Sequence, residues 1–150
     1  MTVAEIKNVI ERAFADTPHP GNNFSDISAT QWDEGIVDYF RRSTWRGHQT
    51  TNLRKHVAAL SFFTHKAFRY WLPAFMLAEL EEPEKADVIS ENIAYSINNE
   101  SRRRLEGFTL DELKAISAFL AECAQRYRCP AYRNAREKLE VMIKNIPNPT

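Results

Sequence analysis

The residues best suited to recognition chemistry are arginines grouped around one tryptophan. The group consists of Arg41, Arg42, Trp45, Arg46 and His48. Arginine beside an exposed tryptophan can stack on a nucleic-acid base or anchor a protein interface. If the tryptophan packs inward, which is common for so large an aromatic side chain, the arginines form a solvated charged surface. This segment is the first candidate binding site, and both positions of the tryptophan remain open.

A second candidate site follows from a proline inside an aromatic stretch. Residues 62–75 contain six aromatic side chains, which core packing explains most simply, together with Pro73. Proline inside a helix removes one hydrogen bond and crowds the carbonyl four residues earlier, here that of Arg69, at a cost of about 3 kcal/mol or more. A kink that wraps the helix around the core accounts for the proline. The functional alternative is a pocket for a small ligand or a substrate beside this proline, lined by His65, Arg69 and Tyr70.

The remaining patterns do not favour catalysis or metal binding. His48, His56 and His65 are eight and nine residues apart, so no two of them have the i, i+4 spacing of a metal-binding helix. Ser61 lacks the Gly-x-Ser-x-Gly surroundings of a hydrolase, and the four glycines are too dispersed to cradle a phosphate. We therefore predict no catalytic residue, no metal and no cofactor.

The charge balance restricts the class of partner. Twenty basic and twenty acidic residues give a formal net charge of zero and a pI near 6.9. Nucleic-acid-binding domains usually carry a basic excess. A helical domain that binds DNA through its arginines is therefore the weakest alternative, and nucleic acid is not the expected partner. A protein with an acidic patch fits the arginine group better.

Length and hydropathy favour a single cytoplasmic domain. A chain of 150 residues suits one domain over residues 1–150, which buries about 70% of the surface that its unfolded form exposes. Charged residues interrupt the apolar pattern of the first fourteen residues, unlike a signal peptide, and no stretch approaches the roughly 20 apolar residues that span a bilayer. We expect no membrane association and two reduced thiols, Cys123 and Cys129.

Helical periodicity and capping signals predict an all-α fold. Thr2 with Glu5 and Thr109 with Glu112 form candidate capping boxes, and Thr64 is a further candidate N-cap. No segment has the period-two alternation of a strand. The expected helices cover about 3–15, a stretch after 30, and about 52–62, 64–80, 83–97, 109–127 and 130–146. We predict a single-domain bundle of about six to seven helices around a central aromatic helix kinked at its proline.

Two connections are expected to be irregular. Residues 16–29 contain prolines and a glycine and are predicted to form a surface loop. Residues 98–107 contain Arg102, Arg103 and Arg104 in succession. This second segment is predicted to be a solvated connection or a fraying helix end.

The central part of the chain resembles an uncharacterised family of small bacterial helical proteins. The resemblance rests on an Ala-Leu-Ser-Phe start at 59–62, an Ala-Phe-Arg-Tyr core at 67–70 and a Leu-Pro-Ala segment at 72–74. It extends to the opening helix and to the late stretch FTLDELKAISAFLAECAQRY. It implies an all-α single domain in a bacterial cytoplasm, and it brings no activity or catalytic residue with it.

These observations favour a non-enzymatic domain that binds another protein. A large core, a neutral charge and the lack of a recognisable catalytic pattern would suit an immunity protein, which neutralises a toxin. The binding surface is expected in residues 16–29 or 41–48, the segments least needed for the core.

Overall fold

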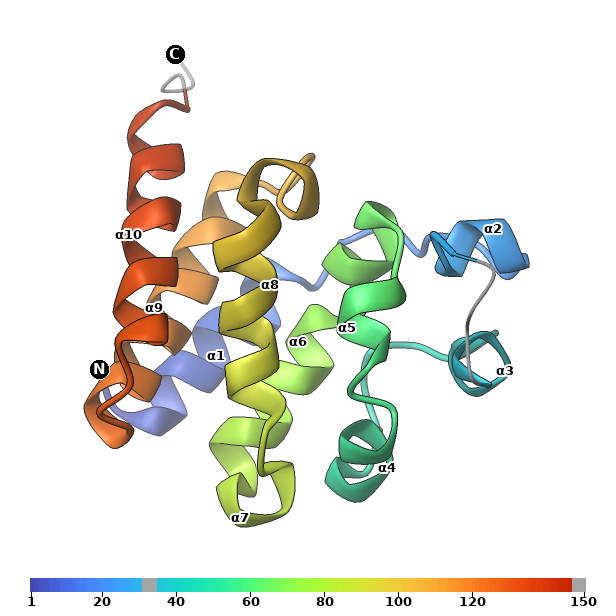
Figure 1. Cartoon of the computed structure of the whole chain (residues 1–150), viewed down its shortest axis with the longest axis horizontal. Coiled ribbons are helices and arrows are strands. Elements are labelled where there is room, and N and C mark those ends of the chain that lie inside the picture. Colours follow the sequence, from blue (N-terminus) through green and yellow to red (C-terminus); the bar gives the residue numbers. More distant parts are fainter. Residues whose placement is uncertain (31–34, 147–150) are drawn as a thin grey trace.

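The computed structural model describes residues 1–30 and 35–146, and within these ranges the chain is all-α, as predicted. Its ten helices there are α1 (Val3–Ala13), α2 (Phe24–Ile27), α3 (Ile36–Phe40), α4 (Thr50–Lys55), α5 (Ala59–Phe62), α6 (His65–Glu81), α7 (Pro83–Ala86), α8 (Ile89–Arg104), α9 (Leu110–Arg126) and α10 (Pro130–Lys144). Figure 1 shows the long helices α8, α9 and α10 on one side of the molecule and the short helices α2 to α5 on the other.

The aromatic helix α6 lies at the centre of the core. Phe68, Trp71 and Phe75 are fully buried, and α6 packs against α1, α4, α7 and α8. Each of these side chains contributes on the order of 1.5 to 3 kcal/mol by leaving water. Thr64 is the N-cap, as predicted, and the helix continues through Pro73 as one element.

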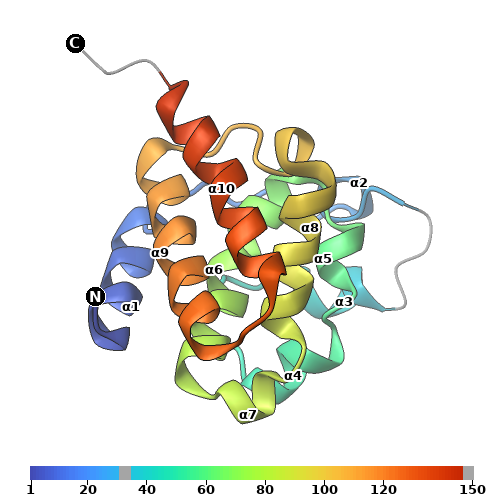
Figure 2. The ribbon, with the colours of Figure 1, turned by 60° about the vertical axis from the view of Figure 1, so that its left-hand side comes forward.

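The long helices form a layer beside α6. Figure 2 shows α10 lying across α8 and α9, while α1 packs against α9 and α6. Both predicted capping boxes are present, at the starts of α1 and α9. The first and last parts of the described chain therefore pack together, with α9 between α1 and α10.

Two predicted helices are each divided in two. The one expected to end near Phe62 is interrupted at residues 56–58 between α4 and α5. The one beginning at Pro83 is interrupted at Asp87, whose φ of 52° ends α7. Arg54 in α4 pairs with this aspartate at 3.3 Å, so the second interruption lies where α4 and α7 meet. The start of the helix expected after Thr30 lies outside the described residues.

Both segments predicted to be irregular contain helical turns, and the second also contains the predicted irregularity. Residues 16–29 include α2, which is tied to the start of α6 because Thr64 donates its backbone N–H to Ile27 O at 3.0 Å. Helix α8 is broken by a kink at Glu100, whose φ is −142°, and then resumes as far as Arg104. The guanidinium of Arg104 donates to the carbonyls of Ser61 and Phe63 at 2.6 and 3.1 Å. The prediction of a solvated arginine is therefore wrong at Arg104, because the helix carries this side chain onto the end of α5.

Throughout residues 1–30 and 35–146, no helix combines the length and the apolar character needed to cross a bilayer.

Candidate functional site

The three predicted arginines lie together on an exposed loop between α3 and α4. We call residues 41–48 the arginine loop. Arg41, Arg42 and Arg46 are exposed, whereas Trp45 is buried with 3% of its surface accessible. The guanidinium carbon of Arg46 lies 4.0 Å from the centroid of the Trp45 ring. The tryptophan therefore packs inward, and it supports a cation–π contact beneath the exposed arginine.

Hydrogen bonds fix the first half of the arginine loop. Ser43 Oγ donates to Phe40 O at 2.7 Å and accepts from Trp71 Nε1 at 3.2 Å. His19 Nε2 donates to Ser43 O at 3.0 Å, while its Nδ1 accepts the N–H of Gly21 at 3.0 Å. One serine thus connects the loop to the centre of α6 and to the segment that follows α1.

His48 fixes the second half of the loop. Its Nε2 lies 2.8 Å from Thr44 O and its Nδ1 lies 2.8 Å from Tyr39 Oη. Because a carbonyl can only accept, Nε2 carries the proton and Nδ1 accepts from the phenol. Burial lowers the pKa of His48, although its bond to Thr44 acts in the opposite direction, and so the neutral ring is favoured. The structure gives this predicted site residue a positioning role in the loop.

The backbone at Arg42 is strained. Its φ is 64°, and its N–H donates to Asn22 Oδ1 at 3.0 Å. A residue other than glycine in this left-handed region costs about 1 to 3 kcal/mol, and such strain concentrates at functional sites. Arg41 lies 4.0 Å from Asp38, and among the described residues Arg42 and Arg46 have no ion-pair partner. Within the described part of the chain, the loop therefore presents two cations without an ion-pair partner on a fixed backbone.

A hollow of about 300 Å³ adjoins the arginine loop. The loop contributes one wall, and α6 contributes an apolar floor that includes Ala74 and Leu77. Three acidic residues lie along its border: Glu11, Glu81 and Glu82. Lys7 pairs with Glu81 at 3.0 Å, and Thr50 donates to Glu82 at 2.8 Å. Arg46 therefore lines the same hollow as three carboxylates, two of which are engaged by other residues.

The second candidate site is only partly assembled. His65 and Arg69 line a hollow of about 230 Å³ together with residues of the loops after α1 and α8. Tyr70 and Pro73 are buried and do not line it. The Tyr70 ring instead packs against His19, with the ring centroids 4.8 Å apart. A pocket formed by all four predicted residues is therefore not present in the described structure.

The described histidine, cysteine and acidic residues form neither a metal site nor a disulfide. Across the part of the chain that the structure describes, no group of three or more histidine, cysteine or acidic residues could hold a metal ion. Cys123 is buried and Cys129 is exposed, and both are free thiols. Burial raises the pKa of Cys123 far above its ordinary range, which keeps this thiol protonated and unreactive.

Comparison with protein families gives one match, to a family of unknown function over residues 2–140. The chain belongs to the DUF6714 family. This confirms the resemblance to an uncharacterised family. Comparisons with curated proteins and with solved structures give no match.

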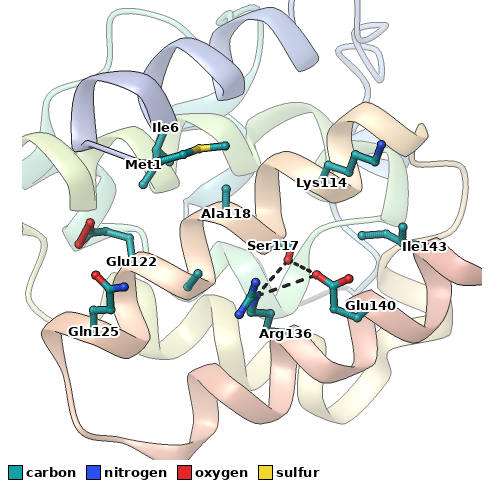
Figure 3. A pocket seen from close by; sticks show the side chains of 11 residues that line it. Met1, Ile6, Lys114, Ser117, Ala118, Glu122, Gln125, Arg136, Glu140 and Ile143 are labelled. Carbon is teal, nitrogen blue, oxygen red and sulfur yellow. Dashed lines mark hydrogen bonds and ion pairs between the residues drawn. The ribbon is translucent and has the colours of Figure 1, made fainter.

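In this DUF6714 protein a further groove, of about 360 Å³, was missed by the sequence analysis. It lies between α1, α9 and α10, with Met1 and Ile6 on one side (Figure 3). Ser117 Oγ donates to Glu140 Oε1 at 2.6 Å and accepts from Arg136 Nε at 3.3 Å. The sequence shows Arg136 and Glu140 as an i, i+4 pair on one helix, but nothing in it indicates that Ser117 lies opposite.

The polar groups of this groove satisfy one another. Serine acts as a nucleophile when a neighbouring base takes its proton and a third group orients that base. Here the Ser117 hydroxyl already bridges α9 and α10, and the groove lining contains no histidine. The arrangement joins two helices of the DUF6714 protein and does not present a nucleophile.

Proposed function

We propose that this chain is a non-enzymatic binding protein whose arginine loop recognises an acidic surface on another protein. In its most specific form, the proposal is that the chain acts in a bacterial cytoplasm as an immunity protein that neutralises a toxin. The observation that carries the proposal is the strained backbone of Arg42 in a loop that hydrogen bonds hold in place. Strain of this kind persists only where the surroundings enforce it.

Preorganisation is what makes the arginine loop suited to recognition. Binding normally costs about 0.5 to 1.5 kcal/mol for each long side chain that becomes immobilised. The loop backbone is already fixed through Ser43 and His48, and Arg46 rests on the Trp45 ring. Less ordering therefore remains to be done when an acidic partner arrives. Arginine also binds carboxylates through two parallel hydrogen bonds, which adds geometric specificity.

The test compares a loop variant with a matched control. The loop variant carries Arg42→Glu and Arg46→Glu, and the control carries Arg102→Glu and Arg133→Glu, two exposed arginines elsewhere. Tagged forms of both and of the wild type are used to capture partners from a bacterial lysate, with identification by mass spectrometry. We expect one stoichiometric partner with the wild type and the control, lost with the loop variant and weakened by salt.

Three results would contradict the proposal. A partner that the loop variant retains would place the interface elsewhere, and repeated captures without a stoichiometric partner would argue against a binding function. Duplex DNA bound at low salt by the wild type and lost in the loop variant would assign the same arginines to nucleic acid. The immunity form requires in addition that the captured partner be toxic to cells and that co-expression of this chain remove the toxicity.

A further inference from the structure

A second recognition site is indicated by the unusual way in which Arg69 is held. Arg69 Nε donates to both carboxylate oxygens of Glu112, at 2.8 and 3.1 Å. The carboxylate is fully buried, whereas the arginine side chain keeps 20% of its surface accessible. The buried end of the guanidinium is therefore fixed, and its outer end reaches the surface.

The anchoring carboxylate is itself fixed by two further donors. Thr17 Oγ1 donates to Glu112 Oε2 at 2.5 Å, and the backbone N–H of Thr109 donates to Oε1 at 2.7 Å. These donors come from the segment after α1 and from the start of α9, so three separate parts of the chain converge on one side chain. An arginine supported in this way loses little freedom when it binds a ligand.

The outer end of Arg69 has donors to spare. Its two terminal nitrogens carry four N–H groups, and among the described residues they make no hydrogen bond. The side chain lines the hollow of about 230 Å³, and Lys66 adds a second, exposed cation to the same lining. Pro18, Pro20 and Gly107 provide an apolar part of the lining, and His19, His65 and Glu106 complete it.

We propose that this hollow binds a small monocarboxylate, with its carboxylate on Arg69 and Lys66 and its apolar body against Pro18 and Pro20. The planar guanidinium fork matches a carboxylate with two parallel hydrogen bonds. The volume limits the ligand to a molecule smaller than most drug-like ligands. Glu106 also lines the hollow, and its negative charge repels a dianion such as phosphate more strongly than a monocarboxylate. The proposal is independent of the arginine loop.

The test uses benzoate as the probe and benzamide as its uncharged match. Binding is followed by NMR chemical shifts of the backbone amides around residues 18–20, 65–69 and 107, with inorganic phosphate as a third probe. We expect saturable shifts with benzoate at millimolar concentration, and weaker shifts with benzamide and phosphate. Lys66→Met should weaken benzoate binding about two- to fivefold, while Lys55→Met, an exposed lysine outside the hollow, should leave it unchanged.

The arginine itself is tested with Arg69→Lys, which keeps a cation beside Glu112 and removes the fork. Benzoate affinity should fall at least about tenfold, with circular dichroism checking that the fold is intact. If this variant does not fold, the comparison of Lys66→Met with Lys55→Met still shows whether benzoate binds in the hollow. Benzamide binding as tightly as benzoate, phosphate binding more tightly, or no saturable shift with benzoate would overturn the proposal.

Discussion

A fully buried glutamate lies near each end of α6, Glu112 of the neighbouring α9 at one end and Glu79 of α6 itself at the other, but the two carboxylates are stabilised differently. Near the N-terminal end, Glu112 receives hydrogen bonds from an arginine, a threonine and a backbone N–H. Near the C-terminal end, Glu79 receives one, from Tyr127 at 2.6 Å, and its Oε2 has no partner within the described residues. The nearby Arg126 pairs with Glu122 instead, at 3.3 Å.

The pKa values at the C-terminal end follow from this lack of a direct cation partner. Burial raises the pKa of Glu79, and the opposing effects of Tyr127 and Arg126 are smaller. Burial and the bond to Glu79 raise the pKa of Tyr127 to about 12. A buried carboxylate next to a cation can remain charged, whereas one that meets only neutral donors favours its protonated form. The two ends of one helix therefore differ in the partners that each buried carboxylate meets.

Removing the cation from the N-terminal end should have the largest effect. Arg69→Met leaves Glu112 buried without its charged partner, and loss of one member of such a pair costs about 3 to 5 kcal/mol. Urea unfolding measures the loss. Adding Glu112→Gln removes the unpaired charge, so the double variant should regain part of the lost free energy of unfolding. Arg103→Met, at an exposed arginine, should change stability by less than about 0.5 kcal/mol. A loss from Arg69→Met no larger than that control would show that the ion pair is not needed.

Removing the donor from the C-terminal end should have a smaller effect. Tyr127→Phe keeps the ring, which lies 5.8 Å from that of Tyr132, and deletes the hydroxyl that bonds Glu79. A buried polar group left without a partner costs about 1 to 3 kcal/mol. Urea unfolding of this variant beside Tyr95→Phe, at a largely exposed tyrosine, isolates the buried bond. Equal stability of the two variants would contradict the assigned role.

The third prediction concerns how stability at the C-terminal end depends on pH. Because the pKa of Glu79 is raised on folding from an ordinary value of 4.5, the folded state holds this proton more tightly than the unfolded state. Its contribution is most favourable below about pH 4.5 and is lost as pH rises through the folded-state pKa. Between about pH 4.5 and the folded-state pKa, the free energy of unfolding of the wild type relative to Glu79→Gln should fall by up to about 1.4 kcal/mol per pH unit. A stability difference that stays constant with pH would show that folding does not shift the pKa of Glu79.

The sequence predicted those elements whose signals are local. The capping boxes at Thr2 and Thr109 and the N-cap Thr64 lie within one helical turn of the groups that they cap, so the starts of α1, α6 and α9 could be placed. The left-handed residue at Asp87 could not be placed, because its conformation coincides with a contact to Arg54 from another helix. The partial burial of Arg104 could not be predicted either, because the carbonyls that accept its hydrogen bonds are more than forty residues away.

In the candidate sites, too, the features that are local in sequence were predicted and the contacts between distant residues were not. The arginine group was found because its members are adjacent in sequence, although the strain at Arg42 was not foreseen. The sequence also pointed to Arg69, but it could not supply Glu112, which lies 43 residues away. Tyr70 and Pro73 were predicted to line the same pocket as Arg69 because they are close to it along the helix. Both belong to the buried part of α6. Tyr70, one position after Arg69, turns toward another side of the helix, whereas Pro73 lies on the same face one turn farther along, where that face is buried.

The packing of α1 against α9 has a consequence for synthesis of the protein. The bond from Thr17 to Glu112 spans 95 residues, and at roughly 5 to 20 residues per second the ribosome needs about 5 to 20 s to make them. During that time Ile6, Ile10 and Phe14, which are buried in the finished protein, have no α9 to cover them. Helix α1 can pack against α6 once that helix has been made, but the part of its apolar face that α9 covers stays without a partner until α9 emerges from the ribosome.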